Sequence, residues 1–290
     1  MLDTRFYDQA LGGIENGQAA AMLPLIAGKL YAAYADQAGW ASAKAALRDH
    51  PLHRVLLEDP FASRAARKPR GYAGDAELID FAYDRDPPTA ASSRGKELFS
   101  ITTSFQAPEG VRRRRDYAER RLSDAWVAGK KICALACGHL READPLIGAD
   151  VSNIVAVDQD PLSLAIVKQN HGDRITTVEA NAIHYLRAAS KATEKFDFIY
   201  TLGMTDYFDT RAMSLLYRLM KDSLAPGGEI LVANFLPDHL GVGWMDAVMD
   251  WHLIYRDEAD MARHAAEIGM QARSFRDETG SIIFCELTSE

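Results

Sequence analysis

The chain has 290 residues, of which 48% are hydrophobic, and it carries a formal net charge of −8. This length and composition provide for one large core and a smaller appended domain. The acidic balance argues against a general nucleic-acid-binding protein, which normally presents a basic surface. The three cysteines, Cys133, Cys137 and Cys285, lack metal-ligand spacing, and Cys133 and Cys137 are expected to be small core residues in a reducing compartment.

The first residues lack the charged-then-apolar order of a secretory signal. The richest early apolar stretch, 19–27, is interrupted by Pro24 and is too short to span a bilayer. We therefore expect a soluble cytoplasmic protein without a membrane partner.

Residues 1–127 show helical spacing and almost no alternating runs. Leu23, Ile26, Leu30 and Tyr34 recur at helical intervals. Prolines divide this half into several short helices and loops; they are Pro51, Pro60, Pro69, Pro87 and Pro88. The sequence predicts an N-terminal helical domain over residues 1–127, followed by a second domain over 128–290.

In the second domain, strands alternate with helices. Strands are predicted at 131–136, 153–157, 174–178, 196–201, 229–234, 270–277 and 281–287. Helices are predicted at 141–147, 161–170, 181–189, 210–223 and 245–268. This alternation predicts a doubly wound, mostly parallel seven-stranded α/β sheet. The last two strands are separated by a hairpin-length turn, so the final strand should be antiparallel to its neighbour.

The first strand–helix–strand unit carries a nucleoside-binding pattern. The apolar run 132–136 ends beside Gly138, and the run 154–157 ends at Asp158, twenty residues after that glycine. An acid at this distance reaches a ribose diol, and the glycine lets a ligand approach the backbone. Gly138 and Asp158 are therefore predicted to bind a cofactor.

Five positions in order resemble the class I S-adenosylmethionine (SAM) methyltransferases, over roughly residues 128–288. Ala136-Cys137-Gly138 is similar to their first motif, Asp158 to the acid that holds the ribose, and Asn181-Ala182 to the position that meets the adenine edge. The segments 196–200 and 224–228 resemble the fourth strand and the turn before the fifth. The resemblance implies a Rossmann-like fold and SAM as cofactor, with Gln159 and Leu202 as further cofactor contacts.

The first motif departs from that family, which often carries Gly-x-Gly-x-Gly. Here His139, Leu140 and Arg141 follow Gly138, so one glycine remains. A nicotinamide-dependent dehydrogenase is the rival nucleotide-binding class, and it would normally place Gly-x-Gly-x-x-Gly at this turn to accommodate a pyrophosphate. The bulky residues favour a ligand without phosphate, such as SAM.

Further motifs resemble a bacterial methyltransferase group that includes enzymes making methyl esters of 3-hydroxy fatty acids. They lie at 68–75, 203–207, 234–235 and 251–256. This resemblance covers most of the chain, including the helical half, and favours carboxyl O-methylation of a hydroxy acid.

The segment 70–75 is predicted to be either a loop with mobile glycines or a lid over cofactor and acceptor. In a lid, Arg70 would pair with a carboxylate of the methionyl part of SAM or of the substrate. Tyr72 would supply a hydroxyl and an apolar face, and it is both a substrate-binding and a catalytic candidate.

Asp206 and Tyr207 follow the fourth strand, at the carboxyl end of the sheet where such folds bind ligands. Asp206 is predicted either to cap the helix near residue 210 or to lie near the transferring methyl as a hydrogen-bonding or basic group. Tyr207 is the second catalytic candidate, and Asn234, at the tip of the fifth strand, is a substrate-binding candidate.

The arginine run 112–115, with Arg120 and Arg121, has two interpretations. Consecutive arginines spread around a helix and nearby acids neutralise part of their charge, so a solvated or interdomain face is favoured over nucleic-acid binding. The alternative places one or two of these arginines against an acidic substrate.

An insertion after the fifth strand holds Trp251, Tyr255 and Arg256. The two aromatic residues are predicted to share a helical face. They either pack in the core or line an acceptor pocket, with Arg256 available for an anionic group. The histidines show no metal-like spacing, so no metal is predicted.

These patterns lead to the hypothesis of a SAM-dependent methyltransferase acting on a small carboxylate-bearing metabolite, with O-methylation of a hydroxy or fatty acid favoured and the helical half as its lid. N- or S-methylation of an amino-acid-like molecule is the alternative. A non-catalytic SAM-binding regulator is an alternative of another class. The acceptor and the oligomeric state, including a homodimer, stay open.

Overall fold

A computed structural model describes residues 3–288, and the chain divides into two compact units. The first unit comprises the chain up to Arg112 together with Asp238–His252. The second comprises Arg113–Pro237 together with the chain from Leu253 onward. The predicted ranges 1–127 and 128–290 are consecutive stretches, whereas the chain leaves the second unit after its fifth strand and returns fifteen residues later.

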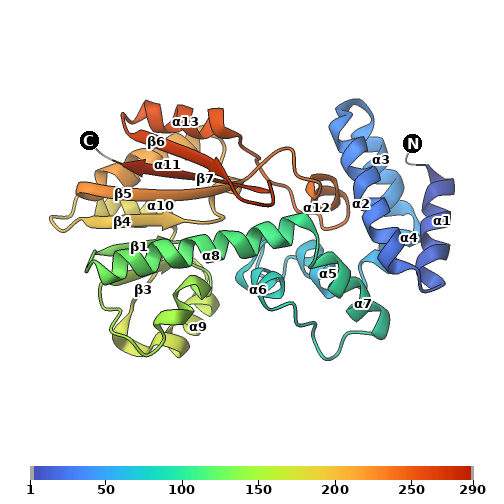
Figure 1. The fold of residues 1–290 in the computed structure, drawn as a ribbon, viewed down its shortest axis with the longest axis horizontal. Helices are drawn as coiled ribbons and strands as arrows, with labels where there is room; N and C mark the ends of the chain where they lie inside the picture. The colour runs from blue at the N-terminus through green and yellow to red at the C-terminus, as the bar shows by residue number, and fades with distance from the viewer. Residues whose placement is uncertain (1–2, 289–290) are drawn as a thin grey trace. The chain divides into compact units, whose positions relative to one another are not determined.

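The first unit is helical, and a helical N-terminal region was predicted (Figure 1). Its helices are α1 (Thr4–Glu15), α2 (Ala19–Ala35), α3 (Gln37–Asp49), α4 (Pro51–Leu56), α5 (Pro60–Arg67), α6 (Ala76–Asp84), α7 (Ser93–Thr102) and α12 (Val242–Ala247). The helix α8 (Gln106–Val127) begins in this unit and continues in the second. Leu23, Ile26 and Leu30 are buried on α2, which confirms their helical spacing.

Local sequence fixes where several of these helices begin. Pro51 and Pro60 occupy first-turn positions, where a missing N–H leaves no hydrogen bond unmade. The side chains of His50 and Asp59 cap the same two helices by accepting hydrogen bonds from backbone N–H groups. Pro24, by contrast, lies inside α2 without ending it.

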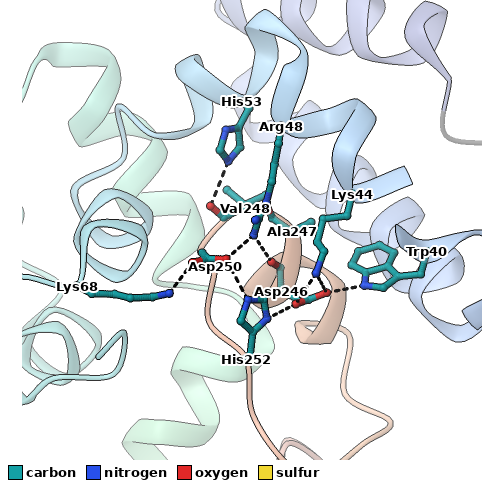
Figure 2. A network of polar contacts seen from close by, with 10 residues as sticks. All are labelled: Trp40, Lys44, Arg48, His53, Lys68, Asp246, Ala247, Val248, Asp250 and His252. Carbon is teal, nitrogen blue, oxygen red and sulfur yellow. Dashed lines mark hydrogen bonds and ion pairs between the residues drawn. The ribbon is translucent and has the colours of Figure 1, made fainter. Parts of the chain in front are cut away.

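Residues 238–252 are held in the first unit by a polar network (Figure 2). Asp246 and Asp250 form hydrogen bonds or ion pairs with side chains of α3 and with the residue after α5, and His252 contacts both aspartates. The partners of the two aspartates are Trp40, Lys44, Arg48 and Lys68. These contacts give the insertion a fixed place among the helices.

The second unit contains a seven-stranded sheet in the order β3-β2-β1-β4-β5-β7-β6. Its strands are β1 (Ile132–Leu135), β2 (Ile154–Asp158), β3 (Thr176–Glu179), β4 (Phe196–Thr201), β5 (Leu224–Phe235), β6 (Gln271–Arg276) and β7 (Ile282–Thr288). The first five strands run parallel, while β7 is antiparallel to both β5 and β6. The predicted α/β sheet with a reversed C-terminal hairpin is confirmed.

Helices cover both faces of this sheet (Figure 1). On one face, α10 (Ala182–Ala189), α11 (Thr210–Asp222) and α13 (Glu258–Glu267) enclose an apolar core with alternate residues of the strands. On the other face, α8 packs Tyr117 against the rings of Phe275 and Phe284. The helix α9 (Pro161–His171) packs against β2 and β3.

The predicted crossover helix at 141–147 is a 3₁₀ segment, η1 (Arg141–Leu146). It contains Pro145, which has no backbone N–H to donate, and it follows Leu140 in a left-handed conformation. The predicted turn at 224–228 is instead the irregular start of β5: pairing with β4 shifts between Phe196↔Leu224 and Phe198↔Glu229, and Gly227 has a φ of 74°.

The predicted single helix at 245–268 is wrong. The chain forms α12 and α13 with a non-helical segment between them. Asp250 takes a left-handed backbone conformation with a φ of 49°, and Asp257 starts α13 through a capping box with Asp260. Among residues 3–288, no helix combines the length and apolar character needed to cross a bilayer.

Candidate functional site

The loop after β1 has an unusual backbone. Ala136, Gly138 and Leu140 adopt left-handed conformations, with φ values of 50°, 55° and 53°. Such a conformation costs a non-glycine residue about 1–2 kcal/mol, so two of these three positions are strained. The alternation matches the Gly-x-Gly-x-Gly pattern position by position. The loop therefore takes, at three alternate positions, a backbone conformation that favours glycine, although only the middle one is a glycine.

Asp158, at the tip of β2, is tied to this loop. Its Oδ2 accepts a hydrogen bond from Gly138 N at 2.8 Å, and its Oδ1 accepts one from Asp160 N at 2.9 Å. Burial raises the pKa of Asp158, and the N–H groups of Asp160 and Gly138 oppose that rise. The backbone N–H of Gln159 also lowers the pKa of Asp158 by hydrogen bonding, and a carboxylate has about four acceptor sites, so this one keeps capacity for a further hydroxyl donor.

The other predicted cofactor positions follow the same ends of neighbouring parallel strands. Gln159 comes after β2 and is exposed, and Leu202 comes directly after β4. Asn181 follows β3, where its side chain caps α10 by accepting from Ile183 N at 3.0 Å, and the adjacent Ala182 is buried. Because parallel strands end at one edge, the sheet brings these residues to a common side.

Asp206 is a buried carboxyl in the 3₁₀ turn η3 (Thr205–Tyr207), only 2% exposed. Its Oδ1 accepts a hydrogen bond from Phe235 N at 2.7 Å, and its Oδ2 lies 3.9 Å from Arg114 Nη1. Burial raises the pKa of Asp206 to about 7, against the opposing effects of Arg114, the Phe235 N–H and Arg256. The predicted capping role is wrong, because Asp209 caps α11.

Arg256 is also buried, but the protein uses its donors internally. Nη1 donates to Thr205 O at 2.8 Å and to Asn234 Oδ1 at 3.0 Å, and Nη2 donates to Phe208 O. The amide nitrogen of Asn234 in turn donates to Ile254 O at 3.0 Å. Arg256 and Asn234 therefore hold the chain around η3, which corrects their prediction as groups available to a substrate.

Arg114 was not among the predicted site residues. It is 4% exposed, and its Nε and Nη1 find no hydrogen-bond partner among residues 3–288. Its guanidinium lies 5.8 Å from the ring centre of Phe235, and a Cβ added to Gly203 would stand 3.2 Å from Nη1. The glycine after β4 thus gives the guanidinium room.

The helical pattern of α8 indicates that Arg114 is buried. Ala118, Leu122 and Ala125 follow it at helical intervals, and all three are buried. Arg113, one position earlier, has a side chain 49% exposed beside Glu278. The arginine run is therefore mixed: Arg113 fits the solvated interpretation, whereas Arg114 fits the alternative of an arginine facing an acidic ligand.

A second buried acid stands near Arg114. Glu142 accepts a hydrogen bond from the Tyr200 hydroxyl at 2.7 Å. Burial raises the pKa of Glu142, which the Tyr200 bond and the nearby Arg114 charge oppose. The Thr201 hydroxyl, at the end of β4, is buried and has no hydrogen-bond partner within the described chain. The edge of the sheet therefore carries a cluster of buried polar groups drawn from α8, η1, β4 and η3.

Three of the remaining predicted residues lie in a different unit from this cluster, which belongs to the second unit. Arg70 and Tyr72 belong to the first unit, where Arg70 Nη2 lies 3.5 Å from Glu77. Trp251 also belongs to the first unit, whereas Tyr255 belongs to the second. Their predicted shared helical face is wrong, because neither lies in a helix.

Tyr207 stands in the second unit and is 40% exposed, beside the buried Asp206. No group of three or more His, Cys, Asp or Glu residues within the described part of the chain could hold a metal ion.

No family model and no curated protein matches the sequence. Among solved structures, a "possible exported protein" from Bordetella parapertussis is similar with a TM-score of 0.59 and 19% identity, over 74% of this chain and 79% of that one. Magnesium protoporphyrin IX methyltransferase (ChlM) from Synechocystis PCC 6803 with bound SAH has a TM-score of 0.47 and 13% identity, over 63% and 86% of the two chains. The N-methyltransferase NodS from Bradyrhizobium japonicum WM9, in complex with S-adenosyl-L-homocysteine, has a TM-score of 0.44 and 14% identity, over 61% and 87%. The first of these likenesses supports the fold described above.

Proposed function

We propose that the protein is a SAM-dependent methyltransferase whose acceptor is a small carboxylate-bearing metabolite. The observation that carries the proposal is the hydrogen bond between Asp158 and Gly138. It joins an acid at the tip of β2 to a loop with left-handed residues at three alternate positions. This is the arrangement a ribose diol requires, and it lacks the glycine spacing that a pyrophosphate requires.

The residues at this edge fit the parts of SAM. Asp158 would accept hydrogen bonds from the ribose hydroxyls, and the residues after β3, Asn181 and Ala182, would meet the adenine. The buried guanidinium of Arg114 offers N–H groups to a carboxylate. When bound, SAM supplies a methyl group attached to a positively charged sulfur. Once the methyl is transferred, the remainder of the molecule leaves as a neutral thioether.

The protein's own contribution is mainly to position the acceptor. In-line methyl transfer gains most from holding the nucleophile close and aligned. A carboxylate oxygen attacks without losing a proton, so carboxyl O-methylation needs no base. For a hydroxyl or amine acceptor, Asp206 in its ionised form would take the proton. We favour O-methylation of a hydroxy or fatty acid.

N- or S-methylation of an amino-acid-like molecule is the second candidate. The buried Asp206 favours it, because an ionised carboxylate would offset the positive charge that develops on a nitrogen or sulfur acceptor. A SAM-binding regulator without catalysis would need no buried acid and no buried arginine beside the nucleoside-binding residues. We therefore rank it below both enzymes.

A labelling experiment tests the function. The protein is incubated with methyl-labelled SAM and a panel of 3-hydroxy fatty acids and amino acids, and the products are then treated with base. We expect labelled product from a fatty acid that releases methanol in base, since only an ester does so. Base-stable label on an amino acid would favour the second candidate, and no transfer to any member of the panel would count against the enzyme.

A further inference from the structure

Two buried arginines flank one aspartate, and they are used in opposite ways. Arg114 and Arg256 are each 4% exposed, and each lowers the pKa of Asp206. Arg256 donates to protein oxygens, whereas Arg114 Nε and Nη1 meet no acceptor among the described residues. A buried charged donor without a hydrogen-bond acceptor costs about 1–3 kcal/mol, so the two unmatched donors of Arg114 point to a ligand that supplies the acceptor.

The surroundings of Arg114 define the chemistry of that ligand. A guanidinium presents planar N–H groups that match a carboxylate. The Asp206 carboxyl, 3.9 Å from Nη1, is beyond hydrogen-bond distance and spends its Oδ1 on Phe235 N. Gly203 leaves the guanidinium uncrowded on one side. The second acid near Arg114, Glu142, is engaged by Tyr200.

We propose that Arg114 is the carboxylate-binding residue of this site, and that Asp206 takes up a proton when the carboxylate binds. This proposal rests on the proposed function and adds to it. The bound anion sits on the guanidinium in place of the Asp206 charge. A proton from solvent then neutralises Asp206, so the buried cluster gains no net charge. In this complex Asp206 serves neither as a base nor as a counter-charge, which favours a carboxylate acceptor over a hydroxyl, amine or thioether. The carboxylate belongs either to the amino-acid end of SAM or to the acceptor.

The balance of charge gives the proposal its pH dependence. The charged groups that face Asp206 are Arg114 on α8 and Arg256 before α13, and Glu142 on η1 also faces Arg114. An added anion favours the neutral form of Asp206, whose pKa is already about 7. Carboxylate affinity should therefore fall above about pH 7, by up to tenfold per pH unit where one proton is taken up.

Three probes identify the carboxylate by calorimetry: S-adenosylhomocysteine, 5′-methylthioadenosine, which lacks the amino-acid end, and 3-hydroxydecanoate added to protein saturated with S-adenosylhomocysteine. We expect Arg114→Gln to weaken one of the two carboxylate probes by about 30-fold or more and to leave 5′-methylthioadenosine within twofold. Loss of S-adenosylhomocysteine affinity assigns the carboxylate to SAM. Loss of 3-hydroxydecanoate affinity alone assigns it to the acceptor.

The proposal is overturned if Arg114→Gln leaves both carboxylate probes within twofold of wild type. If the wild-type protein bound neither S-adenosylhomocysteine nor 5′-methylthioadenosine, the proposed function would be contradicted instead. The effect of Arg114→Gln on 3-hydroxydecanoate binding would then test the carboxylate site by itself. Should Arg114→Gln fail to fold, Gly203→Ala serves as the second variant. Its Cβ would displace the guanidinium by a few tenths of an ångström and should weaken the same probe.

Proton uptake separates a ligand-binding role from a merely structural one. Titrations at pH 7.5 in phosphate and in Tris, which differ in ionisation enthalpy, report the protons taken up with the carboxylate. We expect uptake in wild type, none in Asp206→Asn, and uptake retained in the control Glu142→Gln. Uptake that survives in Asp206→Asn and disappears in Glu142→Gln would overturn the role of Asp206.

Discussion

At the scale of single residues, burial alone does not show what a charged side chain does. Arg114 and Arg256 are equally buried beside the same carboxyl, and only their hydrogen bonds distinguish them. Removing a buried arginine that donates several hydrogen bonds leaves its acceptors unpaired and is expensive, whereas removing one that donates none leaves no acceptor unpaired. The free energy of unfolding of suitable variants therefore separates a binding residue from a structural one.

We predict that at pH 5, where Asp206 with its pKa of about 7 is neutral, Arg114→Met leaves the free energy of unfolding unchanged or raises it by up to about 2 kcal/mol. Arg256→Met should lower it by about 3–5 kcal/mol, because it frees the carbonyls of Thr205 and Phe208 and the amide of Asn234. Denaturant unfolding without ligand measures both. A large loss in Arg114→Met would contradict the account.

Asp206 provides a pH prediction. Its pKa is raised from 3.8 to about 7, so the folded protein binds more protons than the unfolded chain between these values. This acid therefore costs stability as pH rises through that interval, by up to about 1.4 kcal/mol per pH unit, and the cost is constant above it. We expect the free energy of unfolding of Asp206→Asn, relative to that of wild type, to rise by about 2–4 kcal/mol as the pH increases from 4 to 8. Parallel stability curves would show that Asp206 titrates normally.

At the scale of elements, the loop after β1 keeps strained non-glycine residues. Ala136 is exposed, so Ala136→Gly should relieve strain at no loss of packing and raise stability by about 1 kcal/mol. Leu140 has the same backbone conformation but is 1% exposed. Leu140→Gly should therefore lower stability by about 2 kcal/mol or more, because the lost burial exceeds the relieved strain. Equal effects of the two changes, measured by denaturant unfolding, would argue against left-handed strain at Ala136.

The place of α12 in the first unit gives another matched pair. A Cβ on Gly243 would come within 2.5 Å of Leu30 O in α2, while one on Gly28 of α2 would meet nothing within 4 Å. We predict that Gly243→Ala lowers the free energy of unfolding by about 1–3 kcal/mol through overpacking, and that Gly28→Ala raises it by up to about 1 kcal/mol through helix propensity. If Gly243→Ala were as stable as Gly28→Ala, the close approach of α12 to α2 would be refuted.

The elements that sequence could predict are those with a strong period. All seven strands stand near their predicted places. Of these, β1, β2 and β4 are largely buried parallel strands and therefore stand out as continuous apolar runs. The segment 245–268 could not be read this way. Its apolar residues pack in two different units, so their spacing suggested one helix where there are two short ones.

The site was predictable to the extent that its residues follow strand ends. Gly138 lies three residues after β1 and Asp158 is the last residue of β2, so their positions could be derived from the sequence. Arg114 could not be singled out among four consecutive arginines, because its role depends on Gly203 and Asp206, about ninety residues further along the chain. Arg256 and Asn234 were assigned to the substrate because sequence does not show which backbone carbonyls a buried donor will meet.

At the scale of the whole molecule, the chain passes between its two units three times. The crossings lie within α8, after Pro237 and after His252. The insertion between the last two crossings is fixed in the first unit by Asp246 and Asp250 (Figure 2). The chain returns to the second unit at Leu253, shortly before Arg256. Arg256, which holds the chain around η3, therefore lies only four residues after the end of the anchored insertion at His252.

Nucleoside binding by the isolated protein tests the central claim most directly. In calorimetric titrations, S-adenosylhomocysteine should bind and NADH should not, because the loop after β1 lacks the glycines that admit a pyrophosphate. Asp158→Asn should weaken S-adenosylhomocysteine by about 30-fold or more, since it replaces one carboxylate acceptor of the ribose hydroxyls with an amide donor. Binding of NADH in preference to S-adenosylhomocysteine, or an unchanged affinity in Asp158→Asn, would contradict the account.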